Sequence, residues 1–212
     1  MTSRNLIRSA AIAALAAAVF SGPAAAAERN APFGYPTTAL DAPATYAEPP
    51  AAFVQIGRAR HYLGEASFED LTAALGAERV REGEDMFERE FACVAGTENG
   101  RPVVLWLISS DLKTLTEAQL EVTDAVPGRC ARVAAEALPF RLGRLGMGMT
   151  RAEALEYVGE PSGEDGFGWS YWFGQRFLKN ARGLQELELD WLGAEFRDGR
   201  SVRAFASLVK NP

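Results

Sequence analysis

The sequence predicts an α+β fold of two tandem units, each a short helical segment packed on an antiparallel sheet of about three to four strands. A capped-helix pattern occurs twice, 83 residues apart, at residues 67–76 and 150–159. Short apolar or alternating runs, separated by turn residues, follow each copy and predict the strands of a meander. Helices followed by strands, rather than strands alternating with helices, indicate an α+β arrangement.

The two helices share one terminal chemistry. Ser67 and Asp70 fit a capping box, in which the hydroxyl and the carboxylate each accept from a free amide of the first turn. Thr150 and Glu153 repeat that spacing in the second copy. A glycine closes each segment, as expected of a residue that ends a helix in the left-handed conformation.

The first unit is placed at residues 53–124 and the second at residues 142–212. Residues 125–141 are interpreted as a linker with a possible helix over 130–138. Asn99-Gly100 predicts a tight hairpin turn, because such turns require positive φ at both central positions. Asp198-Gly199 predicts another. The predicted strands are 87–95, 103–109, 119–123, 169–173, 185–191 and 201–208.

The two units differ at one strand. In the second unit Glu186, Glu188 and Asp190 alternate with apolar residues, which predicts one buried and one wet face. The matching positions of the first unit are apolar, so that strand is apolar on both faces. These positions are Val103, Leu105 and Leu107. We expect the other unit, the proline-rich arm or a partner to cover them, and they are the first candidate binding residues.

An aromatic run gives the second set of candidate binding residues. Alternation along a strand places Trp169, Tyr171 and Phe173 on one face and Trp172 on the other. Trp and Tyr are enriched at interface hot spots. Packing within the core or between the units is the alternative explanation.

The first 27 residues predict a signal peptide, with Arg4 and Arg8 ahead of a short alanine-rich run and an A-x-A cleavage site. Its removal changes the formal charge from −6 to about −8. Residues 28–52 contain five prolines and predict a disordered or extended arm. No later segment could span a membrane, so we expect a periplasmic protein or, alternatively, a secreted one.

Cys93 and Cys130 are the only cysteines. In an oxidising compartment they predict a structural disulfide, which would stabilise the fold by about 3–4 kcal/mol in the chain-entropy model. The alternative, a redox-active pair, typically has two residues between its cysteines.

Little in the sequence predicts catalysis, a metal or a cofactor. His61 is the single histidine, so no histidine cluster can form. An acidic cluster near one hairpin could in principle hydrolyse glycosides, but a solvated strand edge is the commoner reason for such a run. The acidic net charge also argues against a nucleic-acid partner. The cluster comprises Glu82, Glu84, Asp85, Glu88 and Glu90.

The second unit resembles the SmpA/OmlA outer-membrane lipoprotein family, whose fold doubled in tandem is similar to the β-lactamase-inhibitor protein. The resemblance implies a non-catalytic binding module, either a scaffold in outer-membrane assembly or an inhibitor that grips an enzyme with a concave sheet. The lipoprotein cysteine of the family is missing. The residues that carry the resemblance are Gly148, Met149, Thr150, Gly159, Pro161, Trp169, Tyr171, Phe196, Asp198 and Gly199.

Together these observations favour an exported, non-catalytic module that binds another envelope or secreted protein, in cell-envelope assembly or maintenance. One alternative is an inhibitor of a secreted or periplasmic hydrolase. A second is a hydrolase that uses carboxylates and His61. The sequence leaves the partner and the oligomeric state open.

Overall fold

The structure is a computed structural model that describes residues 30–179 and 182–211. The predicted signal peptide, residues 1–27, lies outside the described residues. Two helices, three 3₁₀ turns and twelve strands occur in the described part. The helical elements are α1 (Phe68–Ala74), α2 (Arg151–Val158), η1 (Thr37–Asp41), η2 (Asp85–Phe87) and η3 (Ala135–Ala137). The strands are β1 (Phe53–Ile56), β2 (Ala59–Tyr62), β3 (Val80–Glu82), β4 (Arg89–Glu98), β5 (Arg101–Ser109), β6 (Glu117–Val122), β7 (Ala131–Arg132), β8 (Phe140–Leu142), β9 (Gly163–Glu164), β10 (Trp169–Lys179), β11 (Gln185–Arg197) and β12 (Arg200–Asn211).

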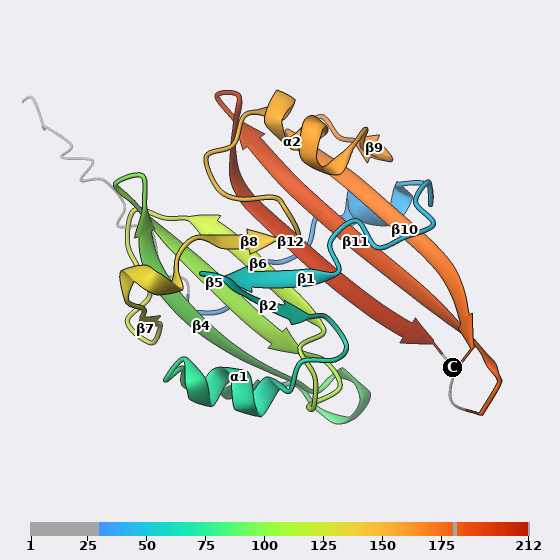
Figure 1. The fold of residues 1–212 in the computed structure, drawn as a ribbon, viewed down its shortest axis with the longest axis horizontal. Coiled ribbons are helices and arrows are strands. Elements are labelled where there is room, and N and C mark those ends of the chain that lie inside the picture. The colour runs from blue at the N-terminus through green and yellow to red at the C-terminus, as the bar shows by residue number, and fades with distance from the viewer. Residues whose placement is uncertain (1–29, 180–181, 212) are drawn as a thin grey trace, which may run out of the picture.

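A single nine-stranded sheet runs through the molecule (Figure 1). Its strand order is β3-β4-β5-β6-β12-β11-β10-β9, with the short β7 parallel to β4. A second, three-stranded sheet has the order β2-β1-β8. The protein is therefore mostly antiparallel β-sheet.

The predicted division into two helix-plus-sheet units is wrong. The last strand of each predicted unit pairs with the other, from Arg203 opposite Glu121 to Ser207 opposite Glu117. Each meander alone would expose a strand edge with unpaired N–H and C=O groups, and the pairing of β6 with β12 satisfies both edges at once. The two meanders thus merge into one sheet, and the helices are minor additions to it.

The repeated local signals are confirmed at this finer level. Thr150 forms the full capping box with Glu153, whereas at the first helix only the hydroxyl half is present, with Ser67 accepting from the Asp70 amide. Gly76 has a left-handed φ of 62°, but Gly159, with φ 103° and ψ −174°, does not adopt the predicted left-handed conformation. The predicted hairpin turns have positive φ at both central residues, as at Asn99 (51°) and Gly100 (76°). The predicted linker helix over 130–138 is not present, since β7 and η3 occupy this segment.

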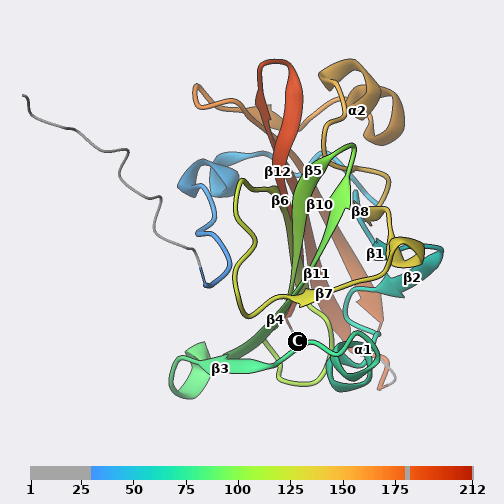
Figure 2. The ribbon, with the colours of Figure 1, turned by 90° about the vertical axis from the view of Figure 1, so that its left-hand side faces the viewer.

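The small sheet and both α-helices lie on one face of the large sheet, which we call the inner face (Figure 2). The apolar side chains of the small sheet and of the helices pack against those of the large sheet and form the main core. Leu105 and Leu107 of β5 and Leu120 of β6 lie there with 0% exposure, beneath Phe140 of β8. Trp172 of β10 joins the same core from the other half of the sheet.

Two separate clusters cover parts of the opposite, outer face. One contains the Cys93–Cys130 disulfide, which ties β4 to the segment before β7 and packs with Trp106. The other contains Phe33, Ala39, Ala42, Trp169, Tyr171 and Phe205. Because β5 is covered on both sides, the prediction that its two faces are buried is confirmed.

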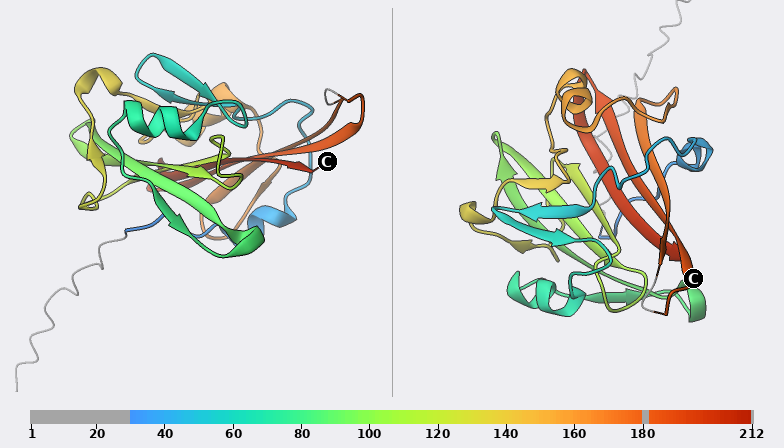
Figure 3. Two further views of the ribbon diagram at one scale, coloured as in Figure 1. Left: turned by 90° about the horizontal axis from the view of Figure 1, so that it is seen from below. Right: turned by 45° about the vertical axis from the view of Figure 1, so that its right-hand side comes forward.

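Residues 30–50, which we call the strap, run along the outer face and then cross to the inner face (Figure 3). The strap is largely extended, but it is held in place rather than free. Its Phe33 amide donates to the Gln119 side chain at 2.8 Å, and Gln119 donates back to the Phe33 carbonyl at 2.9 Å. At the crossing point the Tyr46 amide donates to the Phe173 carbonyl, and the Gln175 amide donates to the Tyr46 carbonyl. Packing thus orders the described part of the predicted arm.

Candidate functional site

The outer face of β10, β11 and β12 is a regular array of side chains, only half of which the strap covers. Strand register aligns Tyr171, Gly193 and Phe205 in one row and Phe173, Trp191 and Ser207 in the next. The strap lies over the first of these rows and leaves most of the second, and all beyond it, open. The apolar members of the open part, which we call the open apolar face, are Phe173, Phe177, Leu187, Leu189, Trp191 and Val209.

The open apolar face includes large, accessible side chains. Phe177 is 63% exposed and Val209 is 44% exposed, whereas the other four are half-buried. Phe173 and Trp191 stack with their ring centroids 4.5 Å apart and nearly parallel planes. Such contiguous apolar surface is unusual on a monomer and marks interaction sites.

An apolar groove separates this face from the strap. Its volume is about 330 Å³, within the usual range of pockets that hold a small ligand or an anchoring side chain. Trp191 forms part of its floor, and the 78%-exposed Leu40 of η1 lies at its side. The lining residues are Tyr35, Pro36, Thr37, Ala39, Leu40, Trp191, Phe205, Ser207 and Val209.

The covered part of the aromatic array is fixed by hydrogen bonds to the strap. Tyr171 donates to Asp165 at 2.7 Å, and Thr38 donates to the same carboxylate at 2.8 Å. Burial raises the pKa of the Tyr171 hydroxyl, so it remains a neutral donor. Burial opposes ionisation of Asp165, but hydrogen bonds from Tyr171, from Thr38 and from two backbone amides hold its pKa below the usual value.

The structure brings three of the six candidate binding residues together. Trp169, Tyr171 and Phe173 share the outer face, as predicted, and Trp172 lies on the inner face. Trp169 and Tyr171 are only 6% and 2% exposed beneath the strap. Phe173 alone belongs to the open apolar face.

The other three candidates, Val103, Leu105 and Leu107, do not lie on any surface. Their exposures are 1%, 0% and 0%, because α1 and the small sheet pack over them. The cover that the sequence required therefore comes from this chain itself, from α1, β1 and β2 of the first half and from β8, rather than from the arm or a partner. With that layer in place, these side chains stabilise the core and cannot contact a partner.

The acidic face predicted to be wet is in fact buried at two positions. Glu188 is 1% exposed and Asp190 is 3% exposed, and both point to the inner face. The alternating apolar residues, including Leu189, are the more exposed set. The assignment of faces was wrong because a period of two reveals two faces but does not say which one the rest of the chain covers.

The buried acids belong to a charged cluster at the end of the core. Arg176 pairs with Glu188 and donates to Glu48 of the strap at 2.7 Å, and Lys210 lies 3.5 Å from Glu188. Asp190 differs, since neither of its oxygens has a hydrogen-bond partner among the described residues. Burial, together with the charge of Glu188, raises the pKa of Asp190 to about 7.

A signal for these acids was present in the sequence. The offset of 83 residues aligns Glu188 with Leu105 and Asp190 with Leu107. Since Leu105 and Leu107 lie in the core, a repeated fold places the two acids on the covered face as well. The break in the repeat is therefore informative at the two acids, because the apolar residues on its other side simply fill the core.

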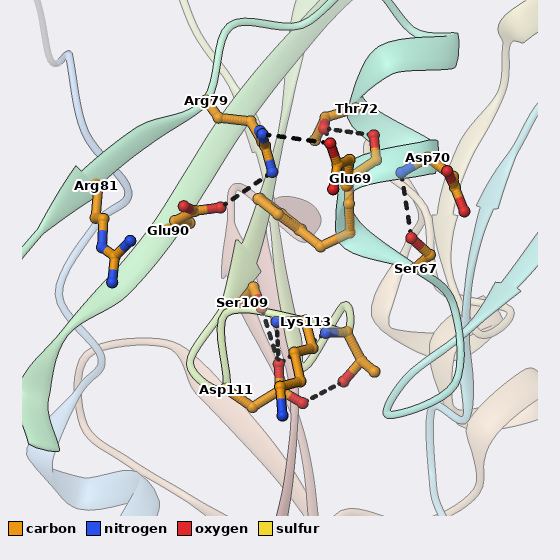
Figure 4. Close-up of polar contacts among 12 residues, drawn as sticks. Ser67, Glu69, Asp70, Thr72, Arg79, Arg81, Glu90, Ser109, Asp111 and Lys113 are labelled. Carbon is orange, nitrogen blue, oxygen red and sulfur yellow. Dashed lines mark hydrogen bonds and ion pairs between the residues drawn. The ribbon is translucent and has the colours of Figure 1, made fainter.

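Three of the five acids of the cluster near residues 82–90, namely Glu82, Glu88 and Glu90, form ion pairs. Arg79 lies between Glu69 of α1 at 3.8 Å and Glu90 of β4 at 3.5 Å (Figure 4). Glu82 pairs with Arg89, and Glu88 pairs with Arg81. These ion pairs connect α1, β4 and the edge strand β3, so the carboxylates stabilise the fold.

Acid–base and metal chemistry find little support in the described residues. His61 lies half-buried on β2, opposite Val54, and burial lowers its pKa. Among residues 30–179 and 182–211 no group of three or more His, Cys, Asp or Glu side chains is placed to hold a metal ion.

Comparison with models of protein families finds no match to this chain. Comparisons with curated proteins and with solved structures find no significant match either. The resemblance to the SmpA/OmlA family therefore rests on the residues that carry it.

Two findings bear on the compartment. Cys93 and Cys130 form a disulfide, which is compatible with export to an oxidising compartment. Within the part of the chain that the structure describes, neither helix has the length and hydrophobicity that a membrane span requires.

Proposed function

We propose that this chain is an exported, non-catalytic module that binds another envelope or secreted protein through the open apolar face. The observation that carries the proposal is the continuity of this face over β10, β11 and β12. It extends from the Phe173–Trp191 stack to Phe177 without an intervening charged side chain in the register rows of these strands.

Physical chemistry supports a macromolecular partner. Aromatic anchors beside a groove are typical of binding hot spots, because they bury much apolar area at little cost in side-chain entropy. Here the groove beside Trp191 could receive one protruding apolar side chain, while Leu40 and Val209 exclude water around it. The face lies on paired strands, so its side chains are already positioned before binding, which lowers the entropic cost.

A photo-crosslinker at position 177 tests this proposal. We would replace Phe177 by benzoylphenylalanine and express the chain with its leader in a bacterial host that has a cell envelope. The cells are then irradiated and the crosslinked adducts are identified. A matched control carries the same residue at Phe87, which is 80% exposed at the opposite edge of the sheet. We expect a defined adduct at position 177 that is absent at position 87 and is lost when Trp191→Ala is added.

The identity of the adduct then decides the role. An envelope protein supports a part in envelope assembly or maintenance, and a hydrolase supports inhibition. Equal labelling at both positions, or none at position 177, contradicts the proposal.

A further inference from the structure

Asp190 is a buried carboxyl group without a partner at the point where the strap crosses the sheet. On the inner face it lies between Gly174 of β10 and Leu208 of β12, its register neighbours. It is 3% exposed, and no described group donates a hydrogen bond to either oxygen. Burying an ionised carboxylate without donors is costly, so this position needs an explanation.

The cover beside Asp190 is made partly by the strap. A side-chain carbon built on Gly174, which faces the same way as Asp190, would lie 3.2 Å from the Glu48 carbonyl oxygen and 3.3 Å from Pro50. On the other side Gly64, in the turn after β2, approaches Leu208 in the same manner. Movement of residues 46–50 would therefore hydrate the carboxyl group without disturbing the sheet.

The charged groups around Asp190 are already engaged with one another. Facing it are Glu48 from the strap, Arg176 from β10, Glu188 from β11 and Lys210 from β12, while the turn after β2 brings Gly64 against Leu208 and Lys210. Arg176 is shared between Glu48 and Glu188, and Lys210 pairs with Glu188. An ionised Asp190 would thus compete with Glu48 for Arg176, whose contact with Glu48 holds the strap.

The same strap covers the aromatic part of the outer face. Tyr46 bonds to the edge of β10 next to Gly174, and further toward the N-terminus the strap covers Trp169 and Tyr171. Loss of the Tyr46 contacts would remove one attachment of the segment that borders the groove, which Thr38 and Gln119 also hold.

We propose that Asp190 is a proton-sensitive latch: protonated, it lets the strap close over it, and ionised, it loosens residues 45–50 from β10. The raised pKa of this carboxyl, about 7, supports a transition near neutral pH. Loosening residues 45–50 would uncover the edge of β10 beside Phe173 and so widen access to the open apolar face, and this consequence alone rests on the proposed function. The latch itself requires no partner.

Hydrogen exchange of the mature chain tests the latch directly. The reporters are the Thr45 and Tyr46 amides, which donate to the Phe173 carbonyl at 3.1 and 3.2 Å. Their protection factors, corrected for the intrinsic pH dependence of exchange, are compared at pH 5 and pH 8. We expect these protection factors to fall at least about tenfold from pH 5 to pH 8. Each unit by which the pKa of Asp190 differs between the closed and the open strap changes the opening equilibrium by a factor of ten. Amides of β5 report global opening, which exposes Asp190 as well, so the latch requires that the Thr45 and Tyr46 amides exchange faster than the β5 amides at both pH values.

Two variants and a control make the outcome decisive. Asp190→Leu introduces the leucine that is found at the equivalent position 107, and it should abolish the decrease in protection. Asp190→Asn serves if the leucine variant does not fold. Asp198→Asn makes the same chemical change in an exposed turn and should behave as the parent chain. Equal protection at both pH values, or an equal decrease in the Asp190 variants, overturns the latch. Neither result bears on crosslinking at position 177, so the two proposals fail independently.

Discussion

Asp190 and Leu107 occupy equivalent positions in the two halves of the sheet, and both side chains are buried on its inner face. One is fully apolar and joins the main core, whereas the other is an acid without a hydrogen-bond partner. The second half therefore retains a destabilising group at a place where the first half shows a stabilising alternative.

Replacing Asp190 by Leu should make the stability of the protein less dependent on pH. The folded-state pKa of Asp190, about 7, lies above that of the unfolded chain. The stabilisation that protonated Asp190 provides is complete below the pKa of this group in the unfolded chain, and it is lost as pH rises through about 7. The free energy of unfolding of Asp190→Leu should exceed that of the parent by on the order of 2–4 kcal/mol at pH 8, and by less at pH 5. Urea unfolding at the two pH values measures this, and an equal difference at both would contradict it.

Truncation of Leu105 and of Leu189 should separate core from surface. Leu105 is fully buried, so Leu105→Ala should lower the free energy of unfolding by about 2–5 kcal/mol. Leu189 lies on the open apolar face, so Leu189→Ala should cost less than about 1 kcal/mol and instead weaken crosslinking at position 177. Denaturant titration of both variants provides the comparison. A large stability loss in Leu189→Ala would mean that this face is not free.

Reduction of the Cys93–Cys130 bond should destabilise the fold without releasing the strap. The bond closes a 37-residue separation, for which the chain-entropy model gives about 3–4 kcal/mol. We expect a lower thermal midpoint in the presence of reductant and in Cys93→Ala/Cys130→Ala. The Thr45 and Tyr46 amides should keep their protection under native conditions. Unchanged thermal midpoints would show that the bond contributes little.

Gln119→Leu should free the N-terminal part of the strap. The Gln119 amide makes two hydrogen bonds with the Phe33 backbone, and leucine would leave those buried groups unpaired at a cost of about 1–3 kcal/mol. Limited proteolysis should then cleave the strap before residue 43 faster than in the parent chain. Gln185→Leu, at an exposed position of β11, should not change the rate. Equal cleavage of both variants would contradict this role of Gln119.

The sequence predicted the local elements of this fold better than their assembly. Helix caps at Thr150 and turn residues such as Asn99 and Asp198 act within a few residues, so their chemistry is readable from the chain alone. The pairing of β6 with β12 joins positions about 80 residues apart, and nothing local encodes it. For that reason the six longest strands were identified but were assigned to two sheets, and the short strands β1, β2, β3, β7, β8 and β9 were not predicted.

The candidate site shows the same limit. Alternation placed Trp169, Tyr171 and Phe173 together on one face, since this depends only on strand geometry. Which face remains open depends on the strap, whose prolines suggested an arm without indicating that Phe33 would pack against Trp169. Val103, Leu105 and Leu107 were misplaced because the sequence did not indicate that α1 and the small sheet would pack over them.

The antiparallel pairing of β6 with β12 makes each half of the chain depend on the other for a complete sheet. A fragment that ends before residue 125 would present β6 as a bare edge, and a fragment that begins after it would present β12. Neither piece is a separable domain in the sense that the repeat suggests. Co-expressed halves should instead recognise each other through the pairing of β6 with β12.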